Sequence, residues 1–116
     1  MSLRLTPGRI AAMYECLRAF PPFNRCKLPR ATDLEFGVTE HYDRHADVDV
    51  VRDWKRLRVS SKYNGHFTSL AMTVAHEMVH LALHARGERG WETHGENFKA
   101  LAAIVCRRFG WDAKVF

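Results

Sequence analysis

The sequence predicts an α+β domain in which helices pack around a small antiparallel sheet. Three observations predict this fold class. Apolar residues recur at helical spacing at both ends of the chain, apolar and polar residues alternate between residues 34 and 61, and a further helical pattern follows directly after this alternation. With 116 residues and no internal repeat or linker, we interpret residues 1–116 as a single domain.

The first helix is predicted to begin at Thr6-Pro7, a capping hydroxyl followed by proline at the first helical position. Pro21-Pro22 ends it. The residues that recur at helical spacing between these signals are Ile10, Met13, Tyr14, Leu17 and Phe20.

Three short strands are predicted between Leu34 and Ser61. Residues 34–38 alternate between apolar and polar, residues 48–51 are valine-rich, and residues 57–61 alternate again, while 42–47 form a polar turn. Their apolar members are Leu34, Phe36, Val38, Val48, Val50, Val51, Leu57 and Val59.

Two further helices are predicted in the second half of the chain. The first, a long helix, starts near Phe67, runs to about Arg86 and stops at Gly87. A loop over residues 87–94 separates it from a last helix, which carries Phe98 on its apolar face and ends at Gly110.

The composition is typical of a soluble globular protein, with 47% hydrophobic and 27% charged residues. No apolar run approaches the roughly 18–20 residues that cross a bilayer, and the start MSLRLTPGRI has no apolar stretch of a signal peptide. We therefore expect a cytoplasmic protein without membrane contact. The three cysteines are widely spaced, which argues against a disulfide framework, and Cys16 and Cys106 are predicted to lie in the core.

The net charge of +5 is distributed in blocks. Basic residues dominate 1–30, 54–75 and 97–116, whereas acidic residues dominate 31–53. Such blocks suggest contact with DNA through basic patches, and the alternative is a solvated surface of mixed sign.

The most informative segment is an H-E-x-x-H motif, formed by His76, Glu77 and His80 inside the long helix. Residues four apart project from the same side of a helix, so both imidazoles can bind one ion at about 2.0–2.1 Å. Glu77, one position away, can act as the general base toward a metal-activated water. This pattern predicts a zinc site with catalytic function.

Three residues compete for the third ligand position. His84 continues the spacing of four, but each such step rotates about 40° around the helix, so three stacked histidines diverge. His94 can fold back over the ion from the glycine-containing loop, and Glu96 is the carboxylate alternative. We favour His94.

The run HEMVHLALHARGERGWETHGENFKAL resembles the core of the SprT-like metallopeptidases, in which His-Gly-x-x-Phe opens the helix after the motif. The matching residues are His76, Glu77 and His80, then His94, Gly95 and Phe98. The segment RLRVSSKY resembles the strand before the active-site helix. The resemblance implies a small zincin-like domain, Zn²⁺ held by His76, His80 and His94, and cleavage of proteins, often proteins bound to DNA.

Two functions follow as hypotheses. The first is a zinc metallopeptidase that hydrolyses peptide bonds in a protein or peptide substrate, with residues 57–61 as the strand that pairs with the substrate. The alternative is a DNA-associated binding module whose zinc is structural or non-catalytic. The oligomeric state is left open.

Other residues near the motif are also candidates. Trp91 is interpreted mainly as a loop anchor, with contact to the substrate as the alternative. His66 and Tyr63 are weaker candidates for contact with the cleft.

Overall fold

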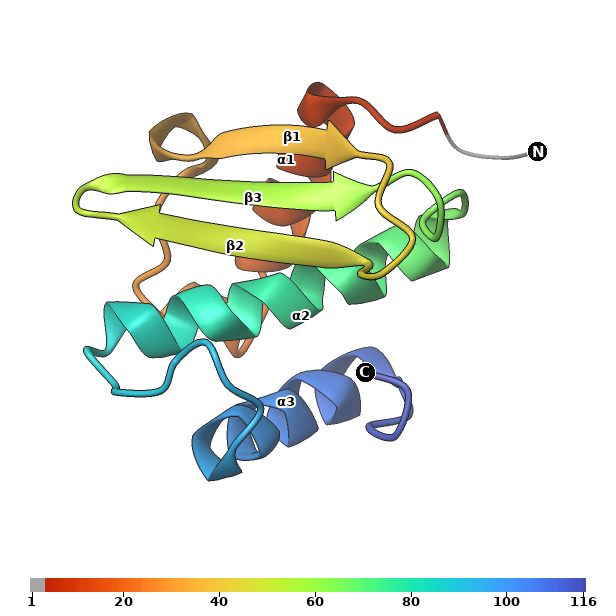
Figure 1. Ribbon diagram of the computed structural model, residues 1–116. Coiled ribbons are helices and arrows are strands. Elements are labelled where there is room, and N and C mark those ends of the chain that lie inside the picture. The colour runs from red at the N-terminus through yellow and green to blue at the C-terminus, as the bar shows by residue number, and fades with distance from the viewer. Residues whose placement is uncertain (1–3) are drawn as a thin grey trace.

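The computed structural model describes residues 4–116 as three α-helices packed with a three-stranded sheet. The order is α1 (Pro7–Arg18), η1 (Phe23–Arg25), η2 (Ala31–Asp33), β1 (Glu35–Thr39), β2 (Ala46–Val51), β3 (Trp54–Ser60), α2 (Phe67–Ala85) and α3 (Glu96–Phe109). In Figure 1, α2 lies alongside β2, and α3 lies on the side of α2 that faces away from the sheet. The predicted α+β class is confirmed.

The sheet differs from the prediction in one respect, because it is mixed rather than antiparallel. Its strand order is β1-β3-β2, in which β3 pairs parallel with β1 and antiparallel with β2. Residues 40–45 lead from β1 to β2, which lies two strand positions away. The hairpin that follows β2 then brings β3 into the position between β1 and β2. The prediction that residues 57–61 present a free strand edge is therefore wrong, since β3 is central and β2 is an edge.

Local signals set the helix boundaries. Thr6 caps α1, with its hydroxyl accepting from the backbone N–H of Arg9 at 3.2 Å. After α2, Gly87 adopts a φ of 75°, and Gly110 caps α3 with a φ of 77°. Both values lie in the left-handed region that glycine adopts without strain, which explains why each helix stops there.

Helix α2 is the centre of the core. Its buried residues contact α1 on one side and α3 on the other, and its face toward the sheet packs near β2 and β3. The fully buried side chains include Ile10 and Tyr14 of α1, Leu57 and Val59 of β3, Val74, Met78 and Leu81 of α2, and Val105 of α3. A motif on α2 is thus carried by the most firmly packed element.

The two cysteines predicted to be in the core have different environments. Cys106 of α3 is buried, as expected, whereas Cys16 of α1 is exposed. The buried stripe of α1 is Ile10, Met13, Tyr14 and Leu17. Cys16 lies about 100° around the helix from the centre of this stripe, so the prediction for it is wrong.

No helix in the described part of the chain is long and apolar enough to span a bilayer. The first three residues of the segment MSLRLTPGRI lie outside the described residues.

Candidate metal centre and cleft

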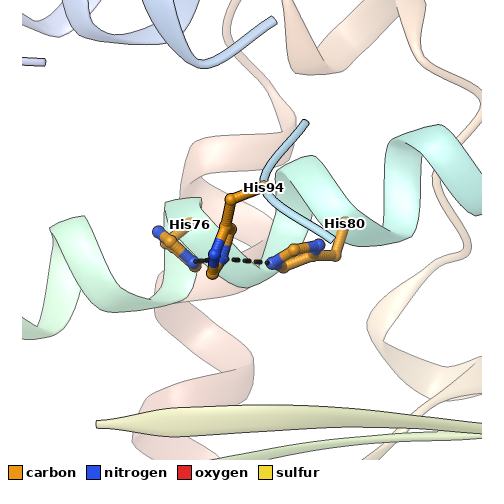
Figure 2. Close-up of side chains that lie close together, drawn as sticks. All are labelled: His76, His80 and His94. Carbon is orange, nitrogen blue, oxygen red and sulfur yellow. Dashed lines mark hydrogen bonds between the residues drawn. The ribbon is translucent and has the colours of Figure 1, made fainter. Parts of the chain in front are cut away.

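Three histidines converge on one point between α2 and the loop that leads into α3. His76 and His80 project from successive turns of α2, and His94 reaches them from the loop (Figure 2). The Nε2 atom of His94 lies 3.0 Å from Nε2 of His76 and 3.2 Å from Nε2 of His80. The structure therefore brings together the three residues predicted as ligands.

Backbone carbonyls orient two of these rings. The Nδ1 atom of His76 lies 2.8 Å from the carbonyl oxygen of Phe116, and Nδ1 of His80 lies 2.7 Å from that of Trp91. A carbonyl oxygen can only accept, so each Nδ1 carries the proton and donates it. Each Nε2 is then left with a lone pair that points toward His94, which is the tautomer that a metal ligand needs.

The donor set fits zinc. Nitrogens bound to a tetrahedral ion at about 2.0–2.1 Å are separated by about 3.3 Å, close to the two Nε2 separations above. One hydrogen on His94 Nε2 could satisfy only one of the two lone pairs facing it, whereas a cation satisfies all three rings at once. Three histidines also leave a fourth position for water, as catalytic zinc sites require. His76, His80 and His94 could thus hold a metal ion.

A phenylalanine ring packs against all three imidazoles. The ring of Phe98, near the start of α3, lies with its centroid 4.8 Å from that of His76 and 4.7 Å from those of His80 and His94. Phe98 is buried, and the ring of Phe116 also packs against His76, with a centroid separation of 5.4 Å. These contacts restrict the rotamers of the ligands before any ion binds.

Burial favours the neutral form of the α2 histidines. Desolvation lowers the pKa of His76 to about 4 although its bond to the Phe116 carbonyl opposes this shift, and desolvation also lowers the pKa of His80. Only a neutral imidazole has the lone pair that binds a metal. Proton competition for these two rings is therefore weak near neutral pH.

Glu77 is a buried carboxyl group beside this cluster. Its side chain is 7% exposed, and burial, followed by the charge of Asp47, raises the pKa of Glu77 to about 8. A carboxyl group whose pKa lies near the working pH is suited to accept a proton and to return it. A cation bound by the histidines would lower this pKa and favour the carboxylate.

A cleft of about 310 Å³ connects Glu77 and His76 to solvent. One side, the helix wall, is formed by Met72, Thr73, His76 and Glu77 of α2; the other side, the strand wall, is formed by His45 and Ala46 at the start of β2. Val115 and Phe116 close one end. The cleft thus places a strand beside the predicted base.

The two alternative ligands lie apart from this cluster. The ring of His84 contacts the ring of Trp91 at 5.1 Å, and Glu96 is exposed at the first position of α3. In the described residues, neither belongs to a group that could share an ion with His76 and His80. Trp91 packs against the core, in agreement with its interpretation as a loop anchor.

Sequence reasoning overlooked two residues of the site. The carbonyl that orients His76 belongs to Phe116, 40 positions along the chain, and no pattern of residue types encodes a backbone acceptor. His45 lines the cleft, although it falls in the segment 42–47 that is predicted only as a polar turn. Its only sequence signal is its position next to a predicted strand.

The sequence matches the SprT-like family over residues 23–115, which is most of the chain. The chain belongs to the SprT-like family. Comparisons with curated proteins and with solved structures gave no match. The family match extends beyond residues 76–101, the run that carries the motif resemblance, and it covers β1, β2 and β3 as well as α2 and α3. The SprT-like assignment agrees with a metallopeptidase-like domain that has a three-histidine cluster able to bind a metal.

Proposed function

We propose that this SprT-like domain is a zinc-dependent metallopeptidase that hydrolyses peptide bonds in protein or peptide substrates. The observation that carries the proposal is the position of Glu77, a buried carboxyl group that shares one cleft with His76 of the three-histidine cluster. A purely structural metal site has no need of an adjacent proton acceptor that is open to a cleft.

His76, His80 and His94 hold the ion in this proposal. Zinc bound there would act as a Lewis acid and lower the pKa of a water molecule toward neutrality. Glu77 accepts a proton from the attacking water and then delivers it to the amine nitrogen as the C–N bond breaks. The buried helix holds the backbone of Glu77 in a fixed place beside the cleft where the substrate would lie.

The edge strand β2 is the best-placed element to bind an extended substrate. The N–H of Ser60 donates to the carbonyl of His45, so these two residues form a hydrogen-bonded pair. Non-hydrogen-bonded and hydrogen-bonded pairs then alternate along β2. In an antiparallel ladder, the backbone groups of Ala46, Val48 and Val50 therefore point away from β3. A substrate strand could pair with these groups and lie with its backbone in the cleft.

Metal analysis combined with a Glu77→Gln variant tests this proposal. The purified wild type should contain one zinc per chain and cleave an unfolded protein substrate, and a chelator should abolish cleavage. Glu77→Gln should keep zinc and lose activity by about 10²–10⁴-fold, because the proton acceptor is removed. Glu96→Gln, a matched carboxyl change outside the cluster, should leave activity unchanged. Unaltered cleavage in Glu77→Gln would contradict the mechanism.

A basic groove supports a second proposal, that the domain also binds DNA. The groove lies between the segment 21–27, the end of α2 and the outer face of α3, and it is lined by Arg25, Lys27, Arg86, Arg107 and Arg108. On the sheet, Arg56 and Arg58 are neutralised by Asp49 and Asp47. In the groove only Arg86 has an acidic partner, Glu88, within the described residues. The remaining cations are available to phosphates.

A salt titration of DNA binding tests the groove. The double variant Arg107→Glu/Arg108→Glu should weaken binding to a single-stranded oligonucleotide and reduce the slope of log affinity against log salt by about 1–2. The double variant Lys55→Glu/Lys62→Glu removes the same charge from the sheet side and should have a smaller effect. Equal losses in both variants would show that net charge, not the groove, governs binding. DNA binding with zinc present and without cleavage would favour the alternative of a non-catalytic binding module.

A further inference from the structure

We infer that His45 is a further catalytic residue, whose imidazole N–H contacts the carbonyl oxygen of the peptide bond being cleaved. This role rests on the proposed peptidase function and identifies a group on the strand wall of the cleft. His45 directly precedes β2, and it lines the same cavity as His76 and Glu77. A substrate carbonyl between the two walls would lie between Glu77 and His45.

A buried hydrogen-bond network fixes the backbone of His45 relative to α2. The carbonyl oxygen of His45 accepts from the backbone N–H of Ser60 at 2.8 Å and from the side-chain amide of Asn64 at 3.3 Å. Asn64 is completely buried, and its Oδ1 accepts from the hydroxyl of Thr73 at 2.6 Å. Thr73 lies three residues before His76 on the same helix, so the network sets the distance between the strand wall and the helix wall.

The imidazole of His45 is positioned by an aromatic neighbour. Its ring stacks on the ring of Tyr63 with a centroid separation of 4.4 Å and an interplanar angle of 2°. The hydroxyl of Tyr63 donates to the carbonyl of Tyr42, which anchors the stacking partner. Stacking covers one face of the imidazole and leaves its edge, where the N–H lies, available to a ligand. This is the preorganisation that a hydrogen-bond donor in an active site requires.

The chemistry of the step defines the task of His45. As the water oxygen adds to the carbonyl carbon, the π electron pair of the C=O bond moves onto the carbonyl oxygen, which becomes negative. A donor aimed at that oxygen stabilises the transition state more than the uncharged substrate. When the C–N bond breaks and the amine takes the proton from Glu77, the pair returns to re-form C=O, and the charge leaves the oxygen. His45 neither gains nor loses a proton in this sequence.

Two exposed histidines away from the cleft provide the contrast. His41 and His66 do not line the cleft, and the side chain of His66 makes no capping bond at the start of α2. His66→Phe is therefore a matched control for a change at position 45. His45→Phe keeps an aromatic ring for Tyr63 to stack on and removes the N–H, while His45→Gln restores an N–H donor without the ring.

Steady-state kinetics on the zinc-loaded protein tests the inference. His45→Phe should lower kcat by about 10²–10³-fold with KM changed less than about threefold, because the lost interaction forms mainly in the transition state. His45→Gln should recover part of this loss, and His66→Phe should resemble the wild type. Wild-type kcat in His45→Phe, or an increase in KM alone, would overturn the role.

Binding of a phosphinic peptide, whose charged oxygens imitate the developing oxyanion, separates this inference from the proposed function. In zinc-loaded protein, His45→Phe should weaken binding of the phosphinic peptide at least tenfold and leave zinc content unchanged. Wild-type protein that binds the analogue in this His45-dependent manner without cleaving peptides would contradict the proposed peptidase and still support the contact. Equal binding by wild type and His45→Phe, or no binding by either, would overturn the contact.

Discussion

The two walls of the cleft are built in different ways. The helix wall belongs to the most buried element of the molecule, and its functional side chains are spaced by the repeat of α2. The strand wall presents His45, an exposed residue held by stacking on Tyr63 and by bonds to its backbone. The helix wall is thus stabilised by core packing, whereas the strand wall depends on a few polar contacts that join it to the helix. The comparison predicts that metal binding and substrate contact can be disturbed separately.

The largest effect on zinc affinity should follow the loss of His94, the one ligand that does not belong to α2. His94→Ala removes one of three converging nitrogens. Loss of a residue that only orients a ligand can weaken metal affinity by roughly 100-fold, so loss of the ligand itself should weaken zinc affinity by more than that. His84→Ala, which removes a histidine that contacts Trp91 instead, should keep zinc affinity within a few fold of the wild type. Competition with a chromogenic chelator measures both. Zinc loss in His84→Ala alone would reverse the ligand assignment.

A smaller effect is expected from the loop that orients His80. Trp91 packs against the core, and its carbonyl oxygen accepts from Nδ1 of His80. Trp91→Ala should loosen this carbonyl and reduce zinc affinity by about 10–100-fold. Trp54→Ala, at the start of β3, is the control and should not change zinc affinity. His45→Phe, on the strand wall, should also leave zinc affinity unchanged. Reduced zinc affinity in His45→Phe would show that the two walls are not independent.

The pH dependence of the metal-free protein probes the helix wall alone. The pKa of Glu77 is raised to about 8, so between pH 4.5 and 8 the folded state binds more protons than the unfolded state, and stability falls as pH rises. The pKa of His76 is lowered to about 4, so its contribution is lost as pH falls from 6.5 to 4.

Between pH 7 and 8 the histidines of the unfolded chain are mostly neutral, so the opposing effects of His76 and His80 are small and the Glu77 effect dominates. It should reduce the free energy of unfolding by about 1 kcal/mol. Urea denaturation in the presence of a chelator measures the change. Glu77→Gln should abolish this decrease of stability with rising pH. A decrease that persists in the variant would assign it to another group.

An effect of similar size on stability is expected from the bond that joins the two walls. Thr73→Val keeps the shape of the side chain, removes the hydroxyl bound to the buried Asn64, and should cost about 1–2 kcal/mol of unfolding free energy. Thr68→Val, at an exposed position in the first turn of α2, should cost less. If Thr73→Val also lowers kcat while zinc affinity is unchanged, the network positions the strand wall. A loss of stability without a change in kcat would show that the network contributes to folding and does not position the strand wall.

The helices and the helix wall could be predicted because their signals are local. Proline, glycine and capping residues mark the ends of α1, α2 and α3 within a few residues, and the spacing of His76 and His80 follows from helix geometry alone. The approach of His94 was one of three alternatives, since a loop's path depends on packing that spacing does not encode. The motif carried enough information for the family, which the match over residues 23–115 confirms.

The sheet and the strand wall could not be predicted with the same success. Alternation located the strands but did not reveal that β3 enters between β1 and β2, so the edge was assigned to the wrong strand. Strand order is decided by long-range pairing, which one sequence does not display. His45 was missed for the same reason, since the contacts that hold it come from Ser60, Asn64 and Tyr63.

The ring of Phe98 beneath all three histidines has a kinetic consequence. A buried hydrocarbon surface blocks approach from the side of α3, and the cleft beside His76 and Glu77 offers a route by which an ion or a chelator arrives. A peptide bound in the cleft would obstruct that route. The rate at which zinc escapes to a chelator should therefore fall as substrate occupancy rises, and zinc release becomes a reporter of binding that needs no turnover.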